Sequence, residues 1–140
     1  MKTLLITLLL GTLGITGCST VAVAPKDARN TPADRVQAPT LRTNDTATAV
    51  FVRDTGFLGG GVNFHIYVDG KDIIQLAPGE RAEVKLDAGT RIIGVIPTDP
   101  FDWHTLLTID QDLKPGQSYY YRVLFTDTSG AAMLQRFIPE

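Results

Sequence analysis

From Thr46 to the C-terminus, apolar and polar residues alternate over short runs. The run 62–68 is typical, because Val, Phe, Ile and Val occupy its even positions while Asn, His and Tyr occupy its odd positions. Such alternation predicts a strand with one buried face. Similar β-rich runs at 47–53, 72–76, 82–87, 91–96, 105–110, 119–125 and 132–138 complete a set of about eight, separated by Gly, Pro and Asp at intervals of about ten residues. The pattern predicts an all-β fold, an antiparallel β-sandwich of about 7–8 strands over residues 46–140.

Three dipeptides predict the turns of this sandwich. Asp69-Gly70 favours a type I′ hairpin, in which both central residues have positive φ. Pro78-Gly79 and Pro115-Gly116 each favour a type II turn. Because successive strands reverse direction, we expect the connections 54–61, 77–80, 98–103 and 126–130 at one end of the domain, and 69–70, 87–90 and 114–117 at the other, where the chain would also enter at Thr46.

Residues 1–17 have the organisation of an export signal. Lys2 supplies the positive start, residues 4–15 are largely apolar, and Gly17 precedes Cys18, the one cysteine of the chain. Ile15-Thr16-Gly17-Cys18 resembles the lipobox of bacterial lipoproteins, which implies cleavage before Cys18 and acylation of that residue. Ser19 stands where lipoproteins retained in the inner membrane usually carry Asp, so the resemblance implies the outer membrane, with the domain facing the periplasm.

Two other interpretations of the N-terminus are weaker. A transmembrane helix needs about 20 apolar residues, more than this segment has. Cleavage after Ala22-Val23-Ala24 would place Pro25 directly behind the cut, where its fixed φ and missing N–H make a poor substrate. Residues 18–45 lack any apolar period and contain three prolines, so we expect the lipidated cysteine followed by a flexible tether. The alternative is that part of this stretch, for example 21–24, adds an edge strand to the sheet.

Residues 66–71, followed by a Pro-Gly turn, an alternating strand and Ala88-Gly89-Thr90, resemble the PEGA-like β-domains and small lipoproteins that share this hairpin pattern. The resemblance covers residues 46 to about 138. It implies a β-sandwich in the cell envelope and no known reaction. Thr90 departs from the histidine or other large residue that usually follows the glycine in those modules.

Charge and composition limit the classes of function. From Thr46 onward there are 8 Lys plus Arg and 12 Asp plus Glu, without a basic run, which argues against nucleic-acid binding. With one thiol, used for lipid, we expect no disulfide, no metal site and no cofactor.

Candidate catalytic residues are few. The strongest local cluster is Asp99, Asp102 and His104, which is the only credible centre for an alternative function as a small hydrolase or metal-dependent enzyme of the envelope. His65 falls on the polar face of its strand, where a solvated or cross-strand role is expected. No serine has the context of a nucleophile.

Two loops carry large apolar residues without an obvious structural role. Phe57 and Leu58 lie among glycines, and Phe101 and Trp103 lie in the loop 97–104. Interfaces favour such residues, so we predict that they form a recognition edge for an envelope protein or a glycan, with Tyr120 as a further contact. The alternative is that the aromatic residues fold back to cover the ends of the sandwich.

These observations predict an outer-membrane lipoprotein that acts as a non-catalytic binding or assembly module. Its partners would be the bilayer, through acylated Cys18, and an envelope protein or glycan. A phage-type or plasmid-type accessory lipoprotein that blocks a surface receptor would share every one of these features. The strand parity places the two apolar loops at the end away from the tether, and therefore away from the membrane.

Overall fold

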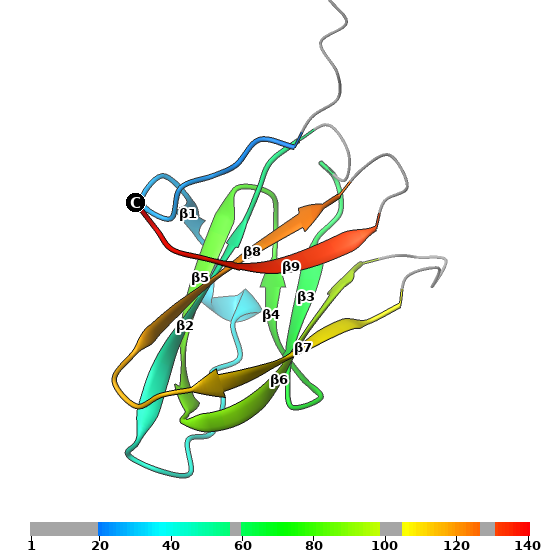
Figure 1. The fold of residues 1–140 in the computed structure, drawn as a ribbon. Helices are drawn as coiled ribbons and strands as arrows, with labels where there is room; N and C mark the ends of the chain where they lie inside the picture. The colour runs from blue at the N-terminus through cyan, green and yellow to red at the C-terminus, as the bar shows by residue number, and fades with distance from the viewer. Residues whose placement is uncertain (1–19, 57–59, 99–104, 127–130) are drawn as a thin grey trace, which may run out of the picture.

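Two β-sheets packed face to face form the protein, as Figure 1 shows. The computed structural model describes residues 20–56, 60–98, 105–126 and 131–140. The sheet strands and one short 3-10 helix in these ranges are β1 (Arg29–Asn30), η1 (Ala33–Arg35), β2 (Thr46–Arg53), β3 (Phe64–Val68), β4 (Lys71–Leu76), β5 (Glu80–Asp87), β6 (Gly89–Pro97), β7 (Leu107–Leu113), β8 (Ser118–Phe125) and β9 (Ala132–Phe137). The predicted β-sandwich is confirmed, and β2 to β9 correspond to the eight runs read from the sequence.

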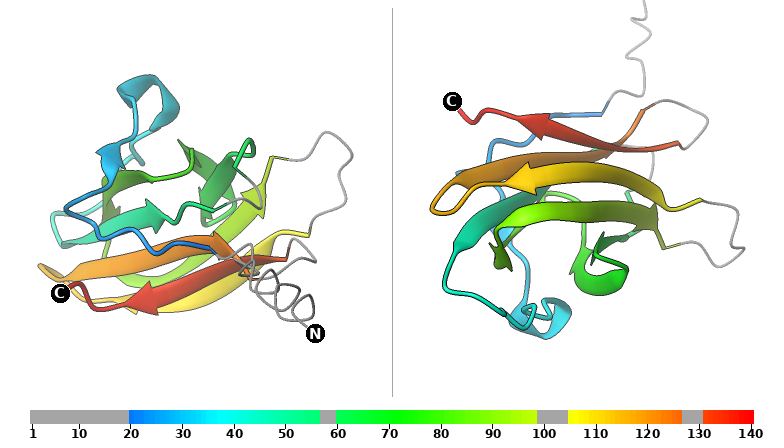
Figure 2. Two further views of the ribbon diagram at one scale, coloured as in Figure 1. Left: turned by 90° about the horizontal axis from the view of Figure 1, so that it is seen from above. Right: turned by 60° about the horizontal axis from the view of Figure 1, so that its bottom comes forward.

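One sheet has the strand order β1-β5-β2-β8-β9, and the other has the order β4-β3-β6-β7. Most neighbours are antiparallel, but β2 pairs with β8 in parallel, and β1 pairs with β5 in parallel. The parallel β2–β8 pair follows from strict reversal along the chain, because an even number of steps separates the two strands. Figure 2 shows the two layers from other directions.

The core lies between the layers and is filled by the inward face of each strand. In β3 the residues alternate between buried and half-buried, as the sequence pattern predicts. Phe51 stacks on Tyr121 with ring centroids 5.2 Å apart, and Phe64 packs on Phe125 at 4.8 Å. Both pairs add to the free energy gained by burial, and the Phe64–Phe125 pair also joins the two sheets, because β3 and β8 belong to different sheets.

The backbone confirms the turns. Asp69 and Gly70 have φ of 50° and 79°, as a type I′ turn requires. Gly79 and Gly116 have φ of 72° and 74°, which fits glycine at the second central position of a type II turn.

The connections gather at two opposite ends of the sandwich. At the first, which we call the Thr55 end, the amide of Gly79 donates to the carbonyl of Arg53, and the amide of Asp54 donates to the carbonyl of Val123. At the second, the Asp87 end, the amide of Ala88 donates to Asp45. The described connections fall at the ends that strand parity predicts.

The N-terminal segment differs from the expected tether. The structure places Val21 in a two-way backbone hydrogen bond with Thr55, and the Thr20 hydroxyl donates to the carbonyl of Phe125 at 3.2 Å. From this Thr55 end the segment runs along one side of the sandwich to the Asp87 end, where β2 begins (Figure 1, blue to cyan). The chain enters β2 at the Asp87 end, as strand parity predicts, but the described segment before β2 first runs along the length of the domain.

Backbone pairing and one ion pair fasten this segment, which we call the strap (residues 20–37). β1 adds to the edge of β5, and the amide of Gln37 donates to the carbonyl of Ile73 in β4 at 2.7 Å. The guanidinium of Arg35 contacts the Glu80 carboxylate at 2.6 Å. The strap therefore covers one edge of each sheet, where exposed strands would otherwise offer unpaired backbone groups.

Candidate functional site

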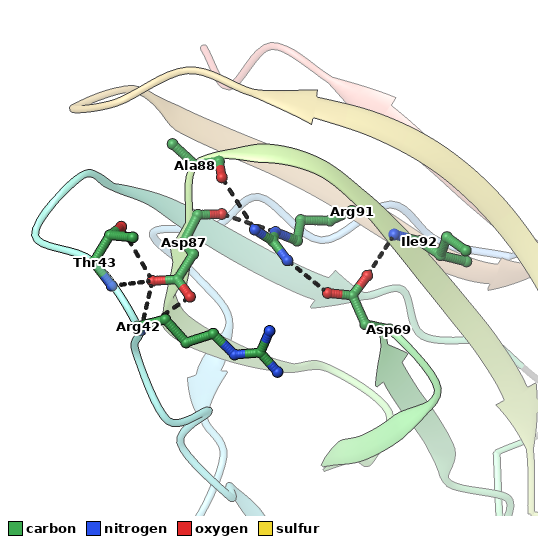
Figure 3. Close-up of polar contacts among 7 residues, drawn as sticks. All are labelled: Arg42, Thr43, Asp69, Asp87, Ala88, Arg91 and Ile92. Carbon is green, nitrogen blue, oxygen red and sulfur yellow. Dashed lines mark hydrogen bonds and ion pairs between the residues drawn. The ribbon is translucent and has the colours of Figure 1, made fainter.

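A pocket of about 130 Å³ opens at the Asp87 end. It forms where the chain before β2 passes over the β3–β4 turn and the corner between β5 and β6. Its lining residues combine an aliphatic surface with charged groups: Pro39, Thr40, Leu41, Arg42, Val68, Asp69, Lys71, Ile73, Leu86, Asp87 and Arg91. The carboxylates of Asp87 and Asp69 form part of its wall (Figure 3).

Asp87 holds the loop that leads into β2. Its two carboxylate oxygens accept the backbone N–H of Arg42, both at 3.0 Å, and one of them also accepts the backbone N–H of Thr43 at 3.2 Å. Desolvation raises the pKa of Asp87, but these amides, the charge of Arg91 and the Thr43 hydroxyl outweigh it and leave the pKa below its usual value. The carboxylate thus stays ionised and fixes the backbone of the loop.

Asp69 ties the β3–β4 turn to β6. Its carboxylate accepts the backbone N–H of Ile92 at 3.0 Å and an N–H of the Arg91 guanidinium at 2.9 Å. Desolvation raises the pKa of Asp69, but the hydrogen bonds from Ile92 and Arg91 and the charges of Arg91 and Arg42 lower it further than desolvation raises it. Arg91 also donates to the carbonyls of Asp87 and Ala88, so one guanidinium joins both sides of the corner (Figure 3).

Two cations of the pocket form no side-chain hydrogen bond or ion pair with the described residues. The guanidinium of Arg42 extends from the loop (Figure 3) and has no hydrogen bond or ion pair within the described ranges, although its charge acts on the Asp69 carboxylate and its backbone N–H is held by Asp87. The Lys71 ammonium, at the start of β4, likewise has none in the described ranges. Since Asp69 and Asp87 are already engaged, the charged groups left for a ligand are positive.

Most of the predicted recognition edge cannot be placed. Phe57, Leu58, Phe101 and Trp103 lie outside the described residues. Tyr120 is half-buried in β8 and packs edge-on against Phe137 with ring centroids 6.0 Å apart.

Tyr120 also lies away from the ends of those loops. It lies five positions before Phe125 along β8, a distance of about 17 Å at the usual strand rise. Phe125 shares a small cavity at the Thr55 end with Gly56 and Gly60, which flank one of the loops. The structure therefore does not bring Tyr120 to the described ends of that loop.

The candidates for enzymatic chemistry divide in the same way. Cys18, Asp99, Asp102 and His104 fall outside the described residues, and within the described ranges no three His, Cys, Asp or Glu side chains gather at metal-binding distance. His65 is described, and its Nδ1 lies 2.6 Å from the Asp72 carboxylate on the neighbouring strand. The expected cross-strand role of this histidine is confirmed.

Sequence reasoning missed Arg42, Asp69, Asp87 and Arg91 as a group. The sequence pattern assigns Asp69 to a hairpin turn, Asp87 to the end of a strand and the connection after it, and Arg42 to the tether. One signal was present, because strand parity puts both turns at the same end. Parity gives no reason, however, to bring the loop before β2 over them.

Comparison with known proteins gives no family assignment. No protein-family profile matches the chain, and no curated protein matches its sequence significantly. Any statement about function therefore depends on the residues and their geometry.

Proposed function

We propose that the protein is a lipoprotein of the bacterial outer membrane, anchored through acylated Cys18, whose sandwich is a non-catalytic binding or assembly module of the cell envelope. The observation that carries the anchor is Cys18 itself, the one cysteine of the chain, directly behind Gly17 and a short apolar segment. None of the helical residues that the structure describes forms a membrane-spanning helix.

The docking of the strap supports one orientation for a protein anchored through Cys18. Thr20 follows Cys18 by two residues, and two residues span at most about 7 Å. Since Thr20 is hydrogen-bonded at the Thr55 end, a lipid on Cys18 would keep that end close to the bilayer. This reverses the orientation that the sequence predicts, in which the loops 54–61 and 98–103 would point away from the membrane.

The same orientation presents the Asp87-end pocket to the periplasm. β2 joins the two ends and has eight residues, a length of about 26 Å at the usual rise. A site at the Asp87 end would therefore stand clear of the lipid headgroups and be open to soluble envelope components. Its aliphatic lining, and two cations without a side-chain hydrogen bond or ion pair among the described residues, support binding as the role of the domain.

Intact-mass analysis of the full chain recovered from bacterial membranes tests the anchor. We expect a mature protein that begins at Cys18 and carries acyl chains, and an unprocessed precursor for Cys18→Ser, because no other thiol can accept the lipid. A wild-type protein without acyl mass, or one that begins at Pro25, would show that the proposal is wrong.

Spin-labelled lipids in nanodiscs that hold the acylated protein test the orientation. We expect stronger broadening of the amide signals of Thr55 and Thr98 than of Ala88 and Gly116, because the first two lie at the Thr55 end. The opposite order would mean that the Asp87 end faces the bilayer.

A further inference from the structure

The floor of the Asp87-end pocket is aliphatic. Val68, Ile73 and Leu86 line it, although each is at most 6% exposed, and Leu41 stands at the rim with 43% exposed. The volume of about 130 Å³ is close to that of engineered cavities that hold a benzene ring, so the pocket has room for about one aliphatic side chain. Such a group would gain from leaving water.

The rim of the pocket selects for negative charge. Neither Arg42 nor Lys71 has a side-chain hydrogen bond or ion pair among the described residues, although the charge of Arg42 also acts on Asp69. The oxygens of Asp69 and Asp87, in contrast, accept hydrogen bonds from neighbouring groups. A cationic ligand would have to displace those donors. A carboxylate would meet two side chains free to approach it, and charge-assisted hydrogen bonds to carboxylates are stronger than neutral ones.

The floor disfavours a sugar. The hydroxyl groups of a saccharide need hydrogen-bond partners when they leave water, and the side chains of Val68, Ile73 and Leu86 supply none. The ligand that satisfies both floor and rim has an aliphatic group beside a carboxylate. A peptide whose last residue is Val, Leu or Ile carries both groups on that residue, namely the aliphatic side chain and the free α-carboxylate.

We infer that the Asp87-end pocket binds the free C-terminus of a protein or peptide that ends in an aliphatic residue, with its carboxylate between Arg42 and Lys71. This inference rests on the proposed function and names its ligand. The hydrogen bonds of Asp87 and Asp69 hold the loop and the turn that carry the two cations, so the site exists before the ligand arrives and loses little conformational freedom on binding.

Titration of the full chain in detergent with acetyl-Ala-Ala-Val tests the inference. We expect the methyl signals of Val68, Ile73 and Leu86 to shift, and the C-terminal amide of the same peptide to bind about tenfold more weakly. Equal binding of the acid and the amide, or shifts confined to other parts of the protein, would overturn the inference. Isobutyrate that binds as tightly as the peptide would assign the pocket to a small carboxylic acid, and a glucuronic acid disaccharide that binds more tightly would assign it to a glycan.

Arg42→Gln is the decisive variant, because Asp87 holds the backbone of residue 42 and the loop keeps its position. We expect about fivefold weaker binding, as for one exposed charge pair, and more than tenfold weaker binding when Lys71→Gln is added. Lys26→Gln, an exposed lysine of the strap, is the matched control and should bind as the wild type does. Unchanged binding by the double variant would refute the site.

The mass of the same preparation separates this inference from the anchor. Acylated protein that fails to bind the peptide would refute the ligand alone. Peptide binding by protein that carries no acyl chain would refute the anchor alone.

Discussion

Glu80 joins the strap to the sandwich, and its substitution by glutamine should destabilise the protein by about 2 kcal/mol. The residue is 5% exposed at the start of β5. One carboxylate oxygen accepts from the Arg35 guanidinium at 2.6 Å, and the other accepts the backbone N–H of Ala77 at 2.9 Å. Hydrogen bonds to charged groups contribute about 1.5–3 kcal/mol each. Glutamine keeps one oxygen, which accepts a weaker hydrogen bond because it carries no charge. Its NH₂ group faces the second donor and cannot accept a hydrogen bond from it.

Arg53 adds to the cost of this substitution. Its side chain is 2% exposed and lies over the Phe64 ring, 4.4 Å from the centroid. Burial lowers the pKa of Arg53 to about 10, while the charge of Glu80 acts in the opposite direction. Removing the negative charge of Glu80 leaves this buried cation less compensated, so about 2 kcal/mol is a lower bound on the destabilisation.

Thermal unfolding, urea unfolding and hydrogen exchange measure the effect. We expect a melting temperature lower by about 8 °C for Glu80→Gln, and earlier exchange of the Gln37 amide, which pairs the strap with β4. Glu83→Gln makes the same chemical change at an exposed position of β5 and should stay within about 0.5 kcal/mol of the wild type.

A double-mutant cycle with Arg35→Gln isolates the ion pair. The two substitutions should couple by about 1–2 kcal/mol, because each removes the same contact. Additive effects together with unchanged exchange of the Gln37 amide would refute the docked strap and show that this segment is a flexible tether.

Three further predictions concern the core and the Asp87 end. Gly70→Val should destabilise the protein by at least about 1 kcal/mol in urea unfolding, because residue 70 has a φ of 79°, which a β-branched residue resists. A steric clash is not the cause, since a Cβ at residue 70 meets no atom within 4 Å. Gly61→Ala, at a position that is equally open but lacks a positive φ, should not destabilise the protein. Tyr121→Phe should raise the free energy of unfolding by about 1 kcal/mol, since this buried hydroxyl has no hydrogen-bond partner in the described part of the chain; a loss of stability would reveal one. Because folding lowers the pKa of Asp69 and Asp87, their stabilising effect should be complete above the unfolded pKa of about 3.9 and be lost as the pH falls through the folded pKa values. The variant with Asn at both positions should therefore show a flatter profile of unfolding free energy against pH. An unchanged profile would contradict these contacts.

The strands and turns could be predicted because local chemistry determines them. Alternation along 62–68 places one face inward in any packing, and Asp69-Gly70 accepts the positive φ values of its turn wherever the hairpin lies. Strand parity then places the connections at the correct ends, since it needs only the number of strands.

The strap and the pocket could not be predicted in this way. The strap docks through backbone hydrogen bonds, the Arg35–Glu80 pair and the single apolar side chain of Val36 against the core, none of which leaves an apolar period in the sequence. The pocket likewise depends on Arg42 meeting Asp87 across 45 residues of chain. The high content of Pro, Thr and Ala in the strap predicts a flexible chain, although the backbone partners of the strap lie in strands that occur later in the sequence.

The position of the strap has a consequence for the order of folding. Thr20 finds its partner at Phe125, 105 residues later, and Arg35 finds Glu80 45 residues later. Contacts between distant residues form slowly, and a chain made from its N-terminus must complete β4 and the start of β5 before β1 and Arg35 can dock. Until the strap docks, the edges of β4 and β5 stay open to pairing with other chains, so a segment that precedes the sandwich strands in the chain completes the protection of the fold against aggregation.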